Sequence, residues 1–290
     1  MKQTPQPLKD YQLLDCGDFR RLERFADWVV DRPAPQAHWR KKLSEQYWNK
    51  AQAYYIRNEI TQAWSPDSKF PENWQVDVKN FKLQLKPSPN NQLGIFPEQL
   101  DNWRWIKTQI ESYQSENQNQ EPLRILNGFA YTGAATLAAS STETHVEVTH
   151  VDAAKASVNW AKLNALISGF DKHPIRWIVD DILIFLEREI KRKNHYDGFI
   201  LDPPAFGRSG KNHWDIKKDL SKLIQAVNEL LSNNPSFVIL SCHAPELSSL
   251  DLANMLENLQ AFKGRKAQQL DLIIPSLDGN SLPSSICARI

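Results

Sequence analysis

From residue 123 onward, short apolar runs alternate with longer amphipathic stretches. The apolar runs have strand length and the stretches between them have helical periodicity. Strands are predicted at 124–128, 146–152, 175–179, 196–202, 236–241, 267–274 and 284–290. Helices are predicted at 134–141, 153–168, 182–193, 216–232 and 248–262. Alternation of this kind is typical of a parallel sheet with helices on both faces.

The chain before residue 123 has a different pattern. Residues 1–10 are polar and contain two prolines, which predicts a flexible tail. Residues 11–95 consist of short apolar runs broken by glycine and proline, which predicts a small β-rich domain. We assign 96–290 to a second, α/β domain.

A helix is expected to join these two parts of the chain. Pro97 suits a first helical position, and Glu98 in the first turn is favourable to the helix dipole. The spacing of apolar residues predicts that this helix ends near residue 112. The stretch 114–120 has no apolar residue, and a surface loop is expected there.

Composition narrows the class of protein. Apolar residues make up 41% of the 290 residues, which is enough for a full core. With 35 Lys and Arg against 34 Asp and Glu, the net charge of +1 gives no overall attraction to nucleic acid. Three distant cysteines and no apolar leader or span fit a reducing cytoplasm and no membrane. No histidine or cysteine spacing suggests a metal site.

Residues 124–139 read as a strand, a loop with Gly128 and Gly133, and a helix rich in alanine. Such a loop lets a ligand approach backbone at the amino end of a helix. The two glycines are five positions apart and do not form G-x-G-x-x-G. A nucleoside site is therefore expected, whereas a pyrophosphate cradle, and with it a nicotinamide-dependent oxidoreductase, is disfavoured.

Polar residues follow five predicted strands in the same way. Parallel strands place their carboxyl ends at one edge of the sheet, so these residues are expected to form one site. They are Gly128–Gly133, Asp152, Asp180–Asp181, Asp202–Pro204 and Ser241–His243.

Two of these carboxylates suit a nucleoside. Asp152 is a candidate acceptor for both ribose hydroxyls, and Asp181 for the exocyclic amine of adenine. Each has a structural alternative, because each directly precedes a predicted helix and is suited to cap it.

The most specific motif is Asp202-Pro203-Pro204-Ala205-Phe206. Two prolines remove two N–H donors and leave carbonyls able to accept. A rigid carbonyl beside a carboxylate suits the edge of a base, on which Phe206 would stack. The alternative is a rigid turn with Phe206 in the core. Arg208, shortly after the motif, is well placed to meet a phosphate.

Cys242 follows the fifth strand of the series. As a thiolate it could add to C6 of a pyrimidine and activate C5 for methylation. Cysteine is also among the residues most often buried, so an inert core thiol is the alternative.

Taken together, these motifs resemble class I S-adenosylmethionine-dependent methyltransferases. The nearest resemblance is to the bacterial large-subunit ribosomal RNA enzymes that make 5-methylcytidine or 7-methylguanosine. It rests on Asn127, Phe129, Tyr131, Thr132, Gly133, Asp152, Asp181 and Asp202–Phe206, together with Gly94-x-Phe96-x-x-Gln99.

The resemblance implies a Rossmann-like, seven-stranded sheet whose last strand is antiparallel. It places the methionine part of S-adenosylmethionine at Phe129–Gly133, the ribose at Asp152 and the adenine near Asp181. Phe96, Gln99, Asn127 and Asp202 would also line the cofactor site. Asp202 and the Pro203 carbonyl would face the target base, with Pro204, Phe206 and Arg208 contacting the substrate, and Cys242 matches the cytidine nucleophile.

Two departures from that family bear on the substrate. The cytidine enzymes usually carry Ser-Cys-Ser, whereas this chain has Ser-Cys-His at 241–243. The glycine-rich pattern of their N-terminal RNA-binding domain is also missing from 1–90. The expected function is methylation of a base in RNA, ribosomal RNA first. A non-RNA acceptor and a non-catalytic RNA-binding protein are the alternatives.

Overall fold

The computed structural model describes residues 2–3, 8–57, 62–117, 121–142, 145–209, 212–277 and 279–290. The chain divides into two compact units. The C-terminal unit consists mainly of Asn102–Asp271 with Ser285–Ile290. The N-terminal unit consists of Gln3–Asp101 with Leu272–Ser284.

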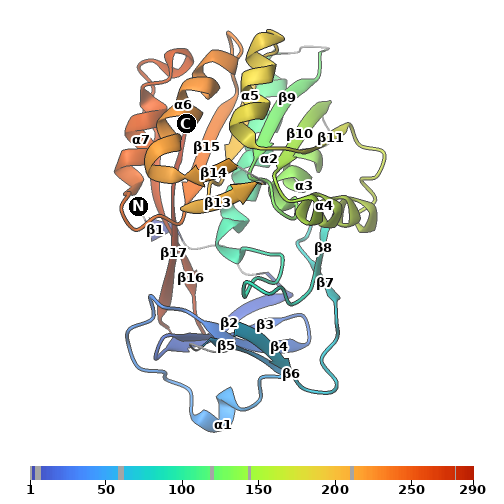
Figure 1. Ribbon diagram of the computed structural model, residues 1–290, viewed down its shortest axis with the longest axis vertical. Coiled ribbons are helices and arrows are strands. Elements are labelled where there is room, and N and C mark those ends of the chain that lie inside the picture. The colour runs from blue at the N-terminus through green and yellow to red at the C-terminus, as the bar shows by residue number, and fades with distance from the viewer. Residues whose placement is uncertain are drawn as a thin grey trace. The chain divides into compact units, whose positions relative to one another are not determined.

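A twisted sheet forms the centre of the C-terminal unit (Figure 1). Its order is β1-β16-β17-β15-β12-β9-β10-β11. Strands β9 to β12 and β15 pair in parallel, and β17 runs antiparallel to β15. The bounds are β1 Lys2–Gln3, β9 Leu123–Gly128, β10 Val146–Asp152, β11 Ile175–Val179, β12 Gly198–Leu201, β15 Phe237–Cys242, β16 Gln268–Pro275 and β17 Ser281–Arg289.

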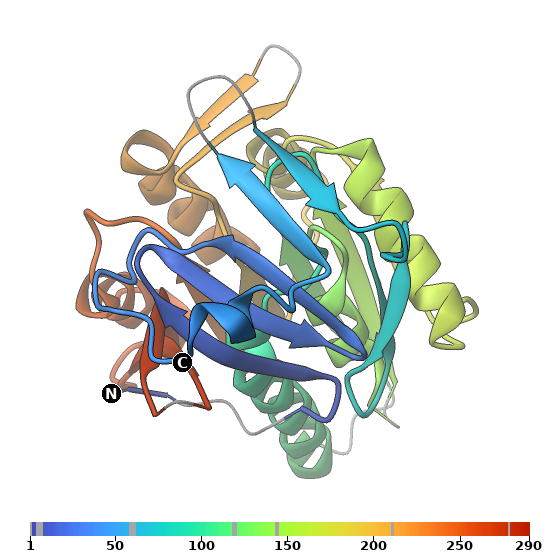
Figure 2. The same cartoon turned by 90° about the horizontal axis from the view of Figure 1, so that it is seen from below.

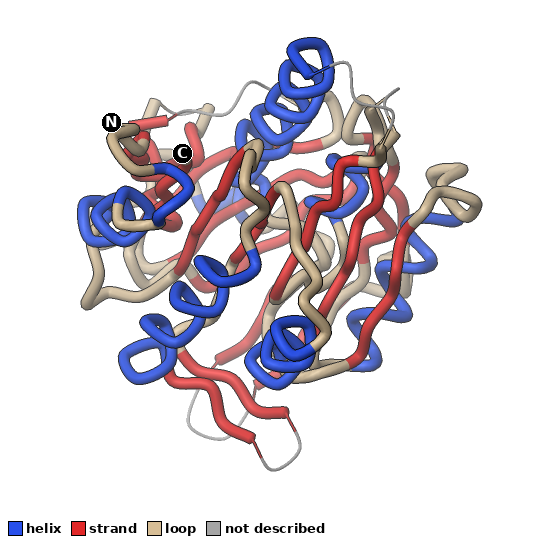
Figure 3. Tube along the Cα trace, turned by 90° about the horizontal axis from the view of Figure 1, so that it is seen from above, coloured by secondary structure: helices blue, strands red, loops and turns tan. Residues whose placement is uncertain are grey.

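This arrangement confirms the predicted seven-stranded sheet, to which the two-residue strand β1 adds an edge. Helices lie on both faces of it (Figure 3). Their bounds are α2 Leu100–Asn117, α3 Ala134–Ser140, α4 Lys155–Ile167, α5 Ile182–Lys191, α6 Ile216–Leu230 and α7 Ser249–Glu257.

Helix α6 illustrates how the pattern of the sequence builds this unit. Its buried apolar positions are Ile216, Leu220, Leu223, Val227 and Leu230, spaced three and four apart on one face. They join the core that α5 and α7 share with β12 and β15. Each fully buried leucine contributes roughly 2 kcal/mol relative to exposure.

The predicted end of the first helix was wrong. A 3-10 turn at Pro97–Gln99 precedes α2, and α2 continues to Asn117 instead of ending near residue 112. Tertiary contacts outweigh the polar composition there: Tyr113 Oη donates to Asn234 O at 2.8 Å and Gln114 Nε2 to His145 O at 2.7 Å. The remainder of the predicted loop, 118–120, lies outside the described residues.

The N-terminal unit is built on a five-stranded sheet of order β2-β3-β4-β5-β6, with α1 on one face of it (Figures 1 and 2). A separate pair, β7-β8, completes it. The bounds are β2 Tyr11–Gly17, β3 Arg20–Phe25, β4 Trp28–Pro33, α1 Glu45–Trp48, β5 Ala53–Arg57, β6 Gln62–Pro66, β7 Trp74–Asp77 and β8 Lys82–Leu85.

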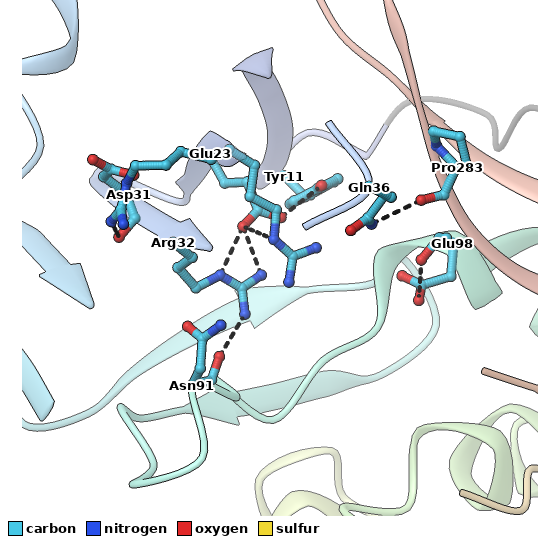
Figure 4. Close-up of polar contacts among 11 residues, drawn as sticks. Tyr11, Glu23, Asp31, Arg32, Gln36, Asn91, Glu98 and Pro283 are labelled. Carbon is cyan, nitrogen blue, oxygen red and sulfur yellow. Dashed lines mark hydrogen bonds and ion pairs between the residues drawn. The ribbon is translucent and has the colours of Figure 1, made fainter. Parts of the chain in front are cut away.

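A buried carboxylate, Glu23, organises the other face of this sheet (Figure 4). Its oxygens accept from Tyr11 Oη at 3.0 Å and from Arg32 Nε at 2.8 Å. Arg32 is itself 1% exposed and also donates to Asn91 O. A buried charge with these partners is compensated, whereas removing one partner would leave it uncompensated.

The N-terminal unit takes its last segment from the end of the chain. Ile274 and Leu282 pack in one buried cluster with Leu13 and Cys16. Gln36 Nε2 donates to Pro283 O at 2.8 Å, as Figure 4 shows. The tip of the β16–β17 hairpin therefore belongs to this unit although it lies far from it in sequence.

Candidate active site

The strand order reverses beside β9. The chain leaves β9 for β10 and β11 on one side, then returns to β12 on the other side. Open α/β sheets bind ligands at such a switch point, outside the carboxyl ends of the strands. Here the loop after β9 and the Asp-Pro-Pro segment after β12 follow the ends of adjacent strands, since Gly128 is the register partner of Leu201.

The loop between β9 and α3, residues 129–133, has an unusual backbone. Phe129, Tyr131 and Gly133 all have positive φ, at 56°, 46° and 84°. Each left-handed residue with a side chain costs roughly 1–2 kcal/mol, so other contacts must hold this conformation.

Hydrogen bonds donated to strand β10 supply that support. Ala130 N–H donates to Val151 O at 3.1 Å, and Tyr131 N–H donates to Asp152 Oδ2 at 2.8 Å. Gly133 N–H closes the turn on Ala130 O at 2.9 Å. Loop and strand end are therefore one rigid unit.

The two glycines serve packing as well as conformation. A Cβ at Gly128 would lie 2.9 Å from Ile182 Cδ1, and a Cβ at Gly133 would lie 2.9 Å from Ala161 Cβ. The space beside each Cα is thus filled by helices α5 and α4. A side chain at either position would therefore meet a neighbouring helix.

A buried polar chain lies behind the loop. Asn127 Nδ2 donates to Thr136 Oγ1 at 2.9 Å, and Thr136 Oγ1 is 2.9 Å from His150 Nδ1. Burial lowers the pKa of His150 to about 3, which keeps its ring neutral. Thr132 is also buried, and its carbonyl accepts from Asn164 Nδ2. Asn127 and Thr132, predicted to bind the cofactor, thus place these polar groups in internal hydrogen bonds.

Asp152 ends β10 with both carboxylate oxygens in use. Oδ2 accepts from Tyr131 N–H and Oδ1 from Ala154 N–H, each at 2.8 Å. Burial raises the pKa of the carboxyl, while these two hydrogen bonds lower it. Each carboxylate oxygen has a second lone pair, so the group remains able to accept from two hydroxyls.

Asp181 caps α5. Its Oδ1 accepts from Leu183 N–H at 3.0 Å and Ile184 N–H at 3.3 Å, which is the structural alternative expected for it. Two apolar side chains nearby in sequence are exposed, Val179 by 49% and Ile184 by 39%. The sequence analysis singled out neither residue, although for Ile184 an apolar side chain in the first turn of a helix was a usable signal.

Asp202 is joined to the neighbouring strand. Ser241 Oγ, near the end of β15, donates to Asp202 Oδ1 at 2.7 Å. Side chains of successive strand residues point to opposite faces, so Cys242 points away from this contact. Cys242 is 1% exposed within the core of α5, α6 and α7. Burial and then the charge of Asp202 raise the pKa of its thiol to about 12.

After Asp202 the chain enters a hairpin, β13 Phe206–Ser209 and β14 Asn212–Asp215, that sequence reasoning missed (Figure 2). Pro203 is buried and Pro204 exposed. Phe206 is 68% exposed, so the alternative that placed it in the core was wrong. The Pro204 carbonyl accepts from Trp214 Nε1 at 2.6 Å.

The basic residues after this segment have different surroundings. Arg208 lies in β13 opposite His213 in the register. Lys217 pairs with Glu246 at 3.0 Å and Lys218 with Asp215 at 3.5 Å, so both already have acidic partners. Lys211 lies outside the described residues.

Phe96 and Gln99 belong to the N-terminal unit, at the 3-10 turn before α2. Gln99 N–H donates to Phe96 O at 3.0 Å. Across the described ranges, no group of three or more His, Cys, Asp or Glu side chains is arranged to hold a metal ion. Nor does any helix in those ranges have the length and apolarity needed to cross a bilayer.

Comparison with known proteins identifies the family. Residues 22–263 match the family described as S-adenosylmethionine-dependent methyltransferase. The chain belongs to this family. A solved methyltransferase of the same description from Agrobacterium tumefaciens is 29% identical to the present methyltransferase. It aligns over 100% of this chain and 92% of its own, with a TM-score of 0.90.

Two further relatives of this methyltransferase are named ribosomal RNA large subunit methyltransferases. Ribosomal RNA large subunit methyltransferase K of Neisseria meningitidis is 33% identical over 38% of this chain and 32% of its own length. Ribosomal RNA large subunit methyltransferase I of Aeromonas salmonicida is 24% identical over 70% and 48%. The chain thus spans less than half the length of these relatives. A putative methyltransferase solved with SAH shares the fold at 19% identity and a TM-score of 0.71.

S-adenosylmethionine is the cofactor of this family, which confirms the predicted cofactor. The strand-end residues suit its chemistry. Asp152 offers acceptors for two hydroxyls, and Asp181 offers one for an amine. The exposed Val179 and Ile184 offer apolar surface of the kind a purine ring covers.

Proposed function

We propose that this methyltransferase transfers the methyl group of S-adenosylmethionine to a nitrogen that carries hydrogen on a base of RNA, with ribosomal RNA as the first candidate. The names of the distant relatives support RNA as the acceptor. The single observation that carries the proposal is the position of Asp202. It lies at the switch point, beside the β9–α3 loop, and is followed by two prolines.

Hydrogen-bond chemistry favours an N–H as the group that the site holds. Pro203 and Pro204 have no N–H, so the backbone there contributes only carbonyl acceptors. The Asp202 carboxylate adds further acceptors and is held by Ser241. A planar base edge with an N–H donor is complementary to such a set. The proton that leaves this nitrogen passes to the Asp202 carboxylate.

The cofactor supplies an electrophilic methyl group, and the chain supplies its position. We assign the methionine part to the β9–α3 loop at Phe129, Tyr131 and Gly133, supported by Asn127 and Thr132 behind it. The ribose is assigned to Asp152 and the adenine to Asp181. Phe96 and Gln99 are kept as candidate lining residues by the resemblance of their segment. Catalysis is then mostly a matter of orientation.

A pyrimidine C5 acceptor is the less favoured version. It needs Cys242 as a thiolate in contact with the base. A thiol that is 1% exposed, with a pKa raised to about 12, is a poor nucleophile at neutral pH. The buried alternative for Cys242 accounts for its surroundings without further assumption.

The exposed ring of Phe206 supports a planar substrate. A phenyl ring that is 68% exposed directly after the Asp-Pro-Pro segment offers a stacking surface for a base. Pro204 is exposed beside it, and Arg208 follows in the hairpin as a candidate phosphate contact. These three are assigned to the substrate.

The deciding experiment is mass spectrometry of modified nucleosides in RNA from cells with and without the gene. One N-methylated base should disappear without the gene. It should return with the wild-type protein but not with Asp202→Ala. The control is Asp171→Ala, at an exposed residue before the amino end of β11, and this variant should also restore the base. Calorimetry should show that all three proteins still bind S-adenosylmethionine.

The other outcomes identify the alternatives. If the base that disappears without the gene is a C5-methylated pyrimidine, the acceptor is a carbon and the mechanism uses Cys242 as nucleophile. An unchanged nucleoside profile with methylation of a small molecule or protein would move the acceptor away from RNA. RNA binding that weakens as salt rises, without any methyl transfer, would leave a non-catalytic binding protein.

A further inference from the structure

Trp214 lies between the two loops that form the site. It comes from β14, opposite Gly207 of β13, and is 7% exposed. Its indole Nε1–H donates to Pro204 O at 2.6 Å. Its ring meets that of Phe129 with centroids 4.8 Å apart and planes at 63°. One side chain thus contacts both the Asp-Pro-Pro segment and the β9–α3 loop.

Each of its two contacts restrains an unusual stretch of backbone. Pro204 follows a proline and has no N–H, so its carbonyl is its only main-chain polar group. Phe129 has a left-handed backbone at φ 56°, which needs contacts to persist. An edge-to-face aromatic pair contributes about 0.5–1.5 kcal/mol beyond burial, and a net hydrogen bond a similar amount.

The hairpin itself is anchored at its base. Ile216 N–H donates to Ala205 O at 3.0 Å, and Asp215 caps α6 through Lys217 N–H at 3.1 Å. Trp214 therefore projects from a fixed platform, and the helix behind it is part of the core. Movement of the indole would have to displace Pro204, Phe129 or both.

We propose that Trp214 is a positioning residue that couples the β9–α3 loop to the Asp-Pro-Pro segment and so sets the separation between methyl donor and methyl acceptor. The proposal rests on the proposed function, which assigns the donor to the first loop and the acceptor to the second. Trp214 touches neither reactant in this scheme. It acts through Phe129 and Pro204.

A positioning role makes a particular kinetic prediction. Trp214→Phe keeps an aromatic ring for Phe129 and removes the N–H that holds Pro204. A misplacement on the order of 1 Å is enough to lower a rate about 100-fold. We expect kcat to fall ten- to a hundredfold, with KM for S-adenosylmethionine changed less than about twofold. Trp105→Phe is the matched control, because Trp105 packs against Phe237 at the amino end of β15, whereas the proposed site lies at the carboxyl ends of the strands.

Hydrogen exchange tests the coupling without an acceptor. Saturation with S-adenosylmethionine should slow amide exchange in peptides covering 127–137 and also in those covering 202–216. In Trp214→Phe the first effect should persist and the second should be lost. In Trp105→Phe both should persist. These measurements need only the cofactor and the intact protein.

The outcomes separate this inference from the function on which it rests. Two outcomes with intact cofactor binding would overturn the coupling alone. In the first, Trp214→Phe keeps the full protection of 202–216. In the second, the cofactor does not protect 202–216 in the wild type. Absence of S-adenosylmethionine binding by the wild type would overturn the proposed function and the coupling with it. An equal loss of protection in both segments would make Trp214 a general stabiliser of the fold and would also overturn the coupling.

Discussion

Ser241 Oγ donates a hydrogen bond of 2.7 Å to Asp202 Oδ1, which joins the carboxyl ends of β15 and β12. The hydroxyl orients a carboxylate at the switch point of the sheet. Cys242, the next residue, points into the core instead. Within the Ser-Cys-His triplet, the serine therefore contacts Asp202 and the cysteine does not.

Ser241→Ala should lower kcat roughly ten- to a hundredfold, because a net hydrogen bond to a charged group contributes roughly 1.5–3 kcal/mol. Affinity for S-adenosylmethionine should stay unchanged in calorimetry. Ser236→Ala, directly before the same strand, is the control and should keep the wild-type rate. Equal rates for the two variants would show that Asp202 needs no orientation.

Cys242→Ala should keep its rate of methyl transfer within about threefold. Removing a buried sulfur should lower the free energy of unfolding by roughly 1 kcal/mol, and Cys287→Ala, at another fully buried thiol, should behave alike. Rates come from nucleoside mass spectrometry and stabilities from urea titration. If Cys242→Ala folds but has no turnover, Cys242 is the nucleophile after all.

Gly133→Ala should be more harmful than Gly169→Ala. Both residues have positive φ, 84° and 76°, so both substitutions cost roughly 1–2 kcal/mol of backbone strain. Only Gly133 adds a steric clash, since its new Cβ would lie 2.9 Å from Ala161 Cβ, whereas nothing lies within 4 Å at Gly169. Urea titration should give a larger loss for Gly133→Ala by roughly 1–3 kcal/mol. Affinity for S-adenosylmethionine should weaken only in that variant.

His150 should make the fold sensitive to acid. Its pKa is lowered to about 3 in the folded protein by burial, whereas an unfolded chain binds a proton near pH 6.5. Between these values the unfolded state holds more protons, so the free energy of unfolding falls as the pH is lowered. From pH 7 to 5 this one group accounts for about 2 kcal/mol.

Urea titrations at the two pH values test this contribution. His150→Gln should lose less stability than the wild type on going from pH 7 to 5, by about that amount. Its stability at either pH alone is not informative, because the substitution also changes the contact with Thr136. Parallel pH profiles for the two proteins would contradict the assignment.

Local patterning predicted most of the C-terminal unit. The strands β9, β12 and β15 are strong signals because they are nearly continuous buried apolar runs. Helix α6 is a strong signal because its buried positions repeat every three or four residues. The hairpin β13–β14 escaped prediction because neither of its strands, Phe-Gly-Arg-Ser and Asn-His-Trp-Asp, contains an apolar run. Trp214, which that hairpin carries, was missed with it.

The tip of the β16–β17 hairpin shows a second limit. Its residues read as strand in the sequence, and they are strand. That Ile274 and Leu282 pack with Leu13 and Cys16 of the N-terminal unit has no local signature. Contacts between segments more than 200 positions apart depend on the whole fold.

By itself, the sequence determined the class of fold, the edge of the sheet where the site lies and the polar residues that end its strands. Element period and the parallel topology are sufficient for that. Only the tertiary structure decided which way each side chain points. It buried Cys242, exposed Phe206, filled the space beside both glycines and brought Trp214 between Phe129 and Pro204. Orientation depends on neighbouring strands and helices that packing brings together, and no single segment encodes it.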